Sequence, residues 1–395
     1  MSDYGWTYLS RSALRRAEQQ LSRAGEGVRD EVGFLIIHQR YADYFFPGTS
    51  VLHTRLRYAL FVPWIYQSLC DEFPAGRISD NLQRLEARLA GKLRRANCWG
   101  VIGERSSRRL MTQPPSVSYW AALGVWGILR KQDGRLPSRA RVHSLLQRRR
   151  RGLDDDGQAL HCPELPFAAL PPRPPEWAGT DPMTFELKPR EAQFLHRQFV
   201  GLSPASRPGH VSVFGRLAAS GGVEADVCYA PAIAEIAKED GVRLRRAGKA
   251  AALAAVGRAV YAGLVEKIRD EEDGQPTSRW HREHLAVVLE QYGADAARLR
   301  LPELIDDVGI MPGAVTDVLD RTLEWLRNGA RNFMALRDVY ERAECSRKHE
   351  RARLSRVTGA SRRLDWQNGE HALAAPLHYR WHVVRTLLHD LWAAA

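Results

Sequence analysis

The chain has 395 residues, enough for two domains, and 44% of them are hydrophobic and 26% charged, as is ordinary for a globular protein. It carries 58 Lys and Arg against 46 Asp and Glu, a net charge of +12, and only seven of these cations are lysines. It has no run of about 18 apolar residues, no apolar leader and no CxxC pair, so we expect a cytoplasmic protein with no membrane contact and no disulfide scaffold.

Two helices are predicted in the first part of the chain, on either side of a turn. Apolar residues recur with helical spacing over residues 34–45, and Pro47-Gly48 then breaks the pattern. Thr49 or Ser50 is expected to cap the second helix, because their hydroxyls accept hydrogen bonds from the free N–H groups of a first turn.

Three further helices follow before the chain changes character. Leucines at helical spacing predict a helix over residues 78–95, and an apolar, aromatic stretch predicts a buried helix over 116–130. A third helix, with Ser138 as its cap, ends in four consecutive arginines. These elements favour a small bundle with a possible helix-turn-helix-like unit over residues 78–150.

A proline-rich segment divides the sequence. Residues 161–189 hold eight prolines, a density that no helix or central strand tolerates, so we read them as a linker or a wrapping segment. Phe167 and Trp177 within it indicate that it packs on the protein. Alternation typical of β-strands is almost absent, and we therefore predict a mainly α fold of two helical domains. The expected parts are an N-terminal helical domain over 1–155, a proline-rich linker over 156–190 and a C-terminal helical domain over 191–395.

Positive charge gathers in three regions. The first holds Arg55 and Arg57, the second is residues 130–151 with nine cations against one acid, and the third is residues 321–363 with twelve against five. Such regions favour a polyanionic partner, nucleic acid and DNA first, bound mainly through its phosphates. The residues expected to contact it are Arg55, Arg57, Arg148, Arg149, Arg150, Arg151, Arg351, Arg353, Arg356, Arg362 and Arg363.

Other readings of these regions stay open. Solvated helix faces carry arginine for solubility, and the use of arginine over lysine can reflect a GC-rich genome. Basic faces can also meet acidic proteins, which would make the chain a scaffold without nucleic acid contact.

Known catalytic motifs are missing from the sequence. Neither a GxxxxGK[ST] phosphate loop nor a GxSxG nucleophile elbow occurs, so we expect no nucleotide cofactor and no metal, and an enzyme is the less favoured class. The alternative enzyme is a metal-dependent nuclease with a non-obvious site. Its ligands would be Glu271, Glu272 and Asp273, or His281, Glu283 and His284.

A resemblance adds context to this reading. FPGTS at residues 46–50, TRxRY at 54–58 and PWIY at 63–66 resemble the opening of an uncharacterised bacterial family of unknown function, and GVIG at 100–103 and YRW at 379–381 resemble its later parts. The resemblance implies a setting in anti-phage defence islands beside helicases and nucleases, and it supplies no catalytic residue. The favoured hypothesis is a non-enzymatic accessory protein that binds nucleic acid and docks a helicase or nuclease partner.

Overall fold

The fold is mainly α-helical, as predicted. The computed structural model describes residues 30–71, 77–103, 113–149, 165–364, 366 and 371–394. Over these residues the regular structure is helical, and the β-type pairing consists of two isolated bridges, Leu129 with Phe167 and Gln132 with Arg135.

The chain forms two compact units, each built from segments that are distant in sequence. The chain passes between the units within helix α2 (Leu35–Phe45), after Lys238 and after Tyr379. These divisions differ from the boundary expected at residues 156–190, whose described part lies inside unit 2. Unit 1 comprises Met1–Tyr41 and Glu239–Tyr379, and unit 2 comprises Ala42–Lys238 and Arg380–Ala395.

Unit 1 is organised around the long helix α11 (Gly241–Glu271), which packs along α12 (Trp280–Ala297). Its middle is rich in alanine and glycine, and small side chains allow neighbouring groups to approach the helix closely. At Gly257 the ring of Phe34 lies where a Cβ atom would otherwise be. The other helices of unit 1 are α13 (Leu301–Val308), α14 (Gly313–Arg327), α15 (Arg337–Lys348) and α16 (Gly359–Arg363).

Helix α11 is also the one helix of the described chain that is long and apolar enough to cross a membrane. Most of its apolar window is buried inside unit 1, at 83%. Burial of this kind is typical of the core helix of a soluble protein, and it removes the apolar surface that a lipid bilayer would require.

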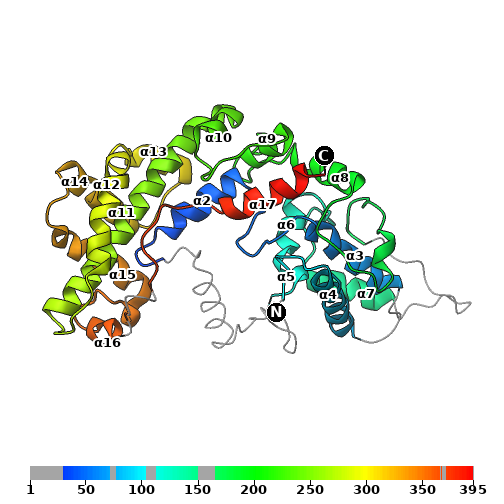
Figure 1. The fold of residues 1–395 in the computed structure, drawn as a ribbon, viewed down its shortest axis with the longest axis horizontal. Coiled ribbons are helices and arrows are strands. Elements are labelled where there is room, and N and C mark those ends of the chain that lie inside the picture. Colours follow the sequence, from blue (N-terminus) through cyan, green and yellow to red (C-terminus); the bar gives the residue numbers. More distant parts are fainter. Residues whose placement is uncertain are drawn as a thin grey trace, which may run out of the picture. The chain divides into compact units, whose positions relative to one another are not determined.

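Unit 2 has helix α3 (Tyr58–Asp71) at its centre, where every residue from Tyr58 to Tyr66 is buried. The last helix of the chain, α17 (Trp381–Trp392), lies against two helices of this unit, α8 (Pro189–Phe199) and α9 (Val213–Ser220) (Figure 1). The remaining helices of unit 2 are α4 (Ile78–Arg95), α5 (Pro115–Ser118), α6 (Trp120–Val125), α7 (Arg139–Arg149), α8 (Pro189–Phe199), α9 (Val213–Ser220) and α10 (Pro231–Ile236).

Two predicted helices of unit 2 are wrong in their bounds. The helix expected from Thr49 or Ser50 begins only at Tyr58, because the Thr49 hydroxyl donates to the carbonyl of Phe46 at 2.7 Å and closes the turn instead of capping a helix. The helix expected over 116–130 is two short helices, α5 and α6, and the chain leaves helical geometry by Gly127, which has a φ of +72°. Helix α6 has six residues and no cationic side chain, unlike a DNA-recognition helix.

The described part of the proline-rich segment, residues 165–189, packs on unit 2. Phe167 and Trp177 are buried in it. The buried ammonium of Lys92, on α4, donates to the carbonyls of Glu176 and Trp177 at 2.7 Å each. Residues Pro175–Trp177 form a single 3₁₀ turn, and the lysine satisfies the carbonyls at its end.

Candidate nucleic-acid interface

Arg55 forms an ion pair inside unit 2. Its guanidinium donates from Nε and Nη2 to the carboxylate of Asp390 at 3.0 and 2.7 Å, and the N–H of Leu56 donates to the same carboxylate at 2.8 Å. The guanidinium also lies over the rings of Trp99 and Phe185, at 5.2 and 4.9 Å from their centroids. Arg55 therefore joins the loop before α3 to the C-terminal helix α17.

Arg57 is buried and has no surface to offer to a phosphate. It forms a two-bond ion pair with Glu191, with both N–O distances at 2.8 Å, and donates to the carbonyl of Thr184 at 2.9 Å. The two charged side chains are 4% and 3% exposed. Glu191 in turn accepts from the N–H of Lys188 at the start of α8.

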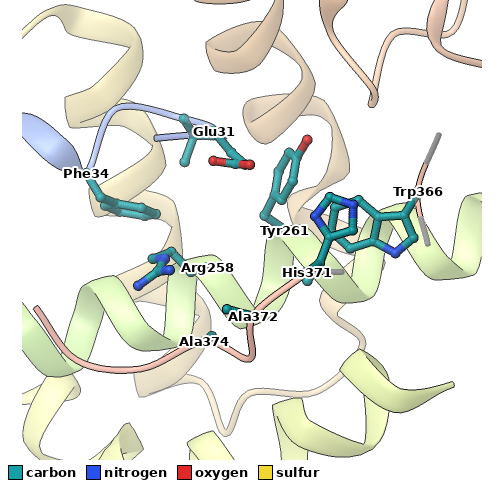
Figure 2. A pocket seen from close by; sticks show the side chains of 10 residues that line it. Glu31, Phe34, Arg258, Tyr261, Trp366, His371, Ala372 and Ala374 are labelled. Carbon is teal, nitrogen blue, oxygen red and sulfur yellow. The ribbon is translucent and has the colours of Figure 1, made fainter. Parts of the chain in front are cut away.

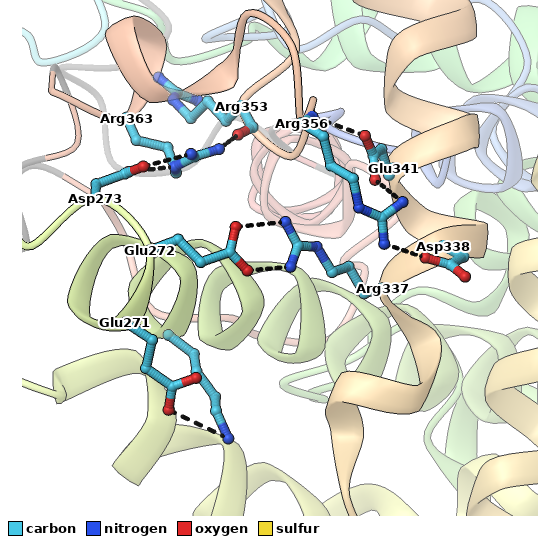
Figure 3. A network of polar contacts seen from close by, with 10 residues as sticks. Glu271, Glu272, Asp273, Arg337, Asp338, Glu341, Arg353, Arg356 and Arg363 are labelled. Atoms are coloured by element: carbon cyan, nitrogen blue, oxygen red, sulfur yellow. Dashed lines mark hydrogen bonds and ion pairs between the residues drawn. The ribbon is translucent and has the colours of Figure 1, made fainter.

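Most cations of residues 321–363 are paired with carboxylates, as Figure 3 shows for part of the region. Arg337 forms a two-bond pair with Glu272 at the end of α11. Arg356 bridges Asp338 at 2.6 Å and Glu341 at 3.0 Å. The positive charge counted along this stretch is thus offset by acids from the same stretch and from α11.

Two of the arginines predicted to bind nucleic acid in this region hold unit 1 together. Arg363 is 4% exposed and pairs with Asp273 through Nε and Nη2 at 2.6 and 2.7 Å. Arg353 lies over the ring of Trp366, 5.4 Å from its centroid, and 4.0 Å from the carboxylate of Glu31.

The other two predicted arginines of this region are exposed. Arg362 donates from Nε to the carbonyl of Glu350 at 3.2 Å. The side chain of Arg351 forms no hydrogen bond or ion pair with any described residue. Five arginines were expected to act together here. Three of them, Arg351, Arg356 and Arg362, are exposed, and Arg356 is paired with carboxylates.

The acidic triplet that could have formed a nuclease site is divided among three cations. Glu271 lies 3.6 Å from Lys267, Glu272 pairs with Arg337, and Asp273 pairs with Arg363. Figure 3 shows the three carboxylates directed to different partners. No group of three His, Cys, Asp or Glu residues placed to hold a metal ion occurs among the described residues.

The second proposed nuclease group is also dispersed. His281 is buried, and its backbone N–H donates to the carboxylate of Glu266 at 3.0 Å. The Nε2 atom of His284 forms a hydrogen bond of 2.8 Å with the carbonyl oxygen of Ala374. The side chain of Glu283 is exposed. The buried carboxylate at the start of α12 is that of Glu266, and it accepts hydrogen bonds from free N–H groups of the first helical turn.

A small pocket lies in unit 1 (Figure 2). The aromatic rings of Phe34, Tyr261 and Trp366 line it, together with the charged side chains of Glu31 and Arg258. None of the arginines predicted to bind nucleic acid lines it.

The basic segment, residues 130–149, differs from the regions above because four of its described cations lie on the surface, while Arg139 is half-buried. A tight turn is closed by two backbone hydrogen bonds between Gln132 and Arg135, at 2.8 and 3.0 Å. The N–H of Arg130 donates to the carbonyl of Pro166 at 2.8 Å, which fixes the turn to the proline-rich segment. Helix α7 follows this turn.

Four cations of the basic segment are exposed and form no hydrogen bond or ion pair through their side chains with any described residue: Arg130, Lys131, Arg135 and Arg141. Arg148 and Arg149 belong to the last turn of α7, and their side chains lie outside the described residues, as do Arg150 and Arg151 altogether.

Helix α8 adds two cations that sequence reasoning missed. Arg190 and Arg197 are exposed and unpaired within the described residues, and their spacing of seven places them on one helix face. The side chain of Gln198 reaches Gly127, three residues before Arg130, and would lie 3.1 Å from a Cβ atom there. The signal was present in the sequence as two arginines opposite the apolar stripe of a strongly amphipathic helix.

The fold concentrates the net charge in unit 2. Its residues carry 29 Lys and Arg against 19 Asp and Glu, a net charge of +10. Unit 1 carries 29 against 27, a net charge of +2. The charge counted over residues 321–363 is therefore cancelled within unit 1, while that of the basic segment is not cancelled within unit 2.

Comparison with known proteins assigns the chain to a family but gives it no activity. No curated protein and no solved structure matches it. One family model matches residues 1–265, which include all of unit 2 except its C-terminal segment. The chain belongs to the family of unknown function DUF6361.

Proposed function

We propose that the protein binds nucleic acid through unit 2, by phosphate contacts from the basic segment and from α8. The observation that carries the proposal is the contrast between paired and unpaired cations. Arg55, Arg57 and Arg363 are held by carboxylates, whereas the exposed cations of residues 130–141 and of α8 have no such partner among the described residues.

The physical basis is electrostatic attraction to a regular polyanion. A surface with an uncompensated charge of +10 attracts phosphates and releases their counterions, and it requires neither a cofactor nor a metal. DNA is the partner we test first. The contacts carry no base readout, because the exposed side chains of the tight turn are not displayed along a recognition helix.

The experiment compares two variants with equal loss of charge. Arg130, Lys131 and Arg135 are changed to Gln in one variant, and the exposed, unpaired Arg331, Arg342 and Arg351 of unit 1 in the other. Fluorescence anisotropy with a labelled DNA duplex is measured at several salt concentrations.

The first variant should bind more weakly, and its plot of log K against log salt should be shallower by about 0.9 for each lost phosphate contact. The unit 1 variant should retain the slope of the unmodified protein. Equal losses in the two variants, or binding that salt does not change, would contradict the proposal.

The wider proposal is that the protein is a cytoplasmic accessory component of an anti-phage defence system that docks a helicase or nuclease. The motifs at residues 46–66 and the buried state of α11 support it. Affinity purification of the tagged protein from its native host, with nuclease treatment of the lysate, tests this part. A helicase or nuclease that co-purifies after the treatment supports docking, and loss of every partner contradicts it.

A further inference from the structure

Trp99 is an exposed tryptophan in unit 2, in the turn that follows α4. Its exposed fraction is 63%, and Trp280 of unit 1, at 54%, is the other tryptophan that appears among the exposed large hydrophobic side chains of the described residues. An exposed indole leaves a large apolar area in contact with water, which folding alone does not favour.

The guanidinium of Arg55 holds the ring of Trp99 in place. The guanidinium lies over this ring, 5.2 Å from its centroid, and also lies over the ring of Phe185, 4.9 Å from its centroid. Asp390 fixes that guanidinium by two hydrogen bonds. A cation over an aromatic ring is a favourable arrangement, and here it orients the indole before any ligand arrives.

The turn that carries Trp99 is fixed by contacts with the residues next to Arg55. The hydroxyl of Thr54 donates to the carbonyl of Gly100 at 2.6 Å. Gly100 has a φ of +82°, and a Cβ atom there would lie 3.0 Å from the Arg55 side chain. The glycine therefore permits both the left-handed turn and the close approach of Arg55.

We infer that Trp99 is a stacking platform for an unpaired base of a single-stranded nucleic acid. Every base offers a flat π-face, and stacking on an aromatic side chain requires no sequence. The bases of a duplex are already stacked on each other, so a duplex offers the platform nothing. This inference rests on the proposed function and specifies its substrate as a single strand.

Helix α8 links the platform to the unpaired cations. Near its start, Glu191 pairs with Arg57, two residues from Arg55, and near its end Gln198 meets Gly127. These two points are seven residues apart on α8, which is about 10 Å at about 1.5 Å per residue. Its exposed arginines can therefore contact the phosphates of a strand whose base stacks on Trp99.

The test uses the full chain and three labelled probes: a single-stranded oligothymidylate of about 16 nucleotides, an abasic strand of the same length, and a duplex. Affinities are measured for the unmodified protein and for Trp99→Ala, Trp99→Phe and the matched control Trp280→Ala. Circular dichroism establishes that each variant is folded.

We expect Trp99→Ala to weaken binding of the oligothymidylate by about 5- to 150-fold and to leave the abasic strand and the duplex unchanged. Trp99→Phe should retain most of the affinity, and Trp280→Ala should retain all of it. Unchanged affinity of Trp99→Ala for the oligothymidylate overturns the inference, and it is the result expected if Trp99 docks a protein instead. An equal loss of affinity for all three probes also overturns it. If the unmodified protein binds none of the probes, the proposed function fails and the inference fails with it.

Discussion

The ion pair between Arg57 and Glu191 gives a quantitative test of the packing of unit 2. Replacing Arg57 by Met removes the guanidinium but leaves the Glu191 carboxylate in a site where its side chain is 3% exposed. A buried charge without its partner costs about 3–5 kcal/mol. For a unit of this size, each kcal/mol lowers the melting temperature by about 2–4 °C, so the expected decrease is about 6–20 °C.

The double variant Arg57→Met/Glu191→Gln separates the charge from the packing. Glutamine still accepts from the N–H of Lys188 and keeps the start of α8 satisfied, while the buried charge is gone. The double variant should therefore be more stable than Arg57→Met alone. The assay is urea unfolding followed by circular dichroism and tryptophan fluorescence. A single variant that loses less than about 1 kcal/mol, or a double variant whose losses simply add, would refute the reasoning.

Two further outcomes follow from buried groups elsewhere. Burial raises the pKa of Glu86, so the folded state disfavours its charged form, and Glu86→Gln should raise the urea midpoint at neutral pH. This gain should vanish as the pH falls below about 4.3, where the unfolded chain is also protonated, and a gain that persists in acid would contradict it. Gly257→Ala should lower the free energy of unfolding by about 1–3 kcal/mol, because its Cβ atom would overlap the ring of Phe34. Gly263→Ala on the same helix is the control: its Cβ atom would meet neighbours no closer than 3.6 Å, and thermal unfolding should show a gain of about 0.5–1 kcal/mol.

Local patterns in the sequence were sufficient for individual helices. The helix predicted over residues 78–95 is α4, with the same bounds, and the leucines of its stripe are buried. An amphipathic helix is determined by spacing along the chain, and spacing is what a sequence displays. The helix expected over 116–130 failed because the left-handed turn at Gly127 outweighed the apolar pattern.

The state of each arginine could not be predicted in this way, because its partner lies far along the chain. Arg55 pairs with a residue 335 positions away and Arg57 with one 134 positions away. Counting charges over residues 321–363 likewise overlooks Glu272 and Asp273, which the fold brings to that region. Trp99 was missed for a similar reason: nothing in the neighbouring sequence distinguishes an exposed tryptophan from the buried ones.

The three passages of the chain between the units impose an order on biosynthesis. Unit 2 cannot be completed when residue 238 leaves the ribosome, because α17 provides Asp390, the partner of Arg55. At about 5–20 residues per second, α17 follows roughly 7–30 s later, after all of unit 1 has been made. The Arg55 guanidinium, which lies over the rings of Trp99 and Phe185, is therefore anchored only at the end of translation. A fragment that stops at residue 265, inside α11, would lack this anchor and would also leave unit 1 without most of its helices.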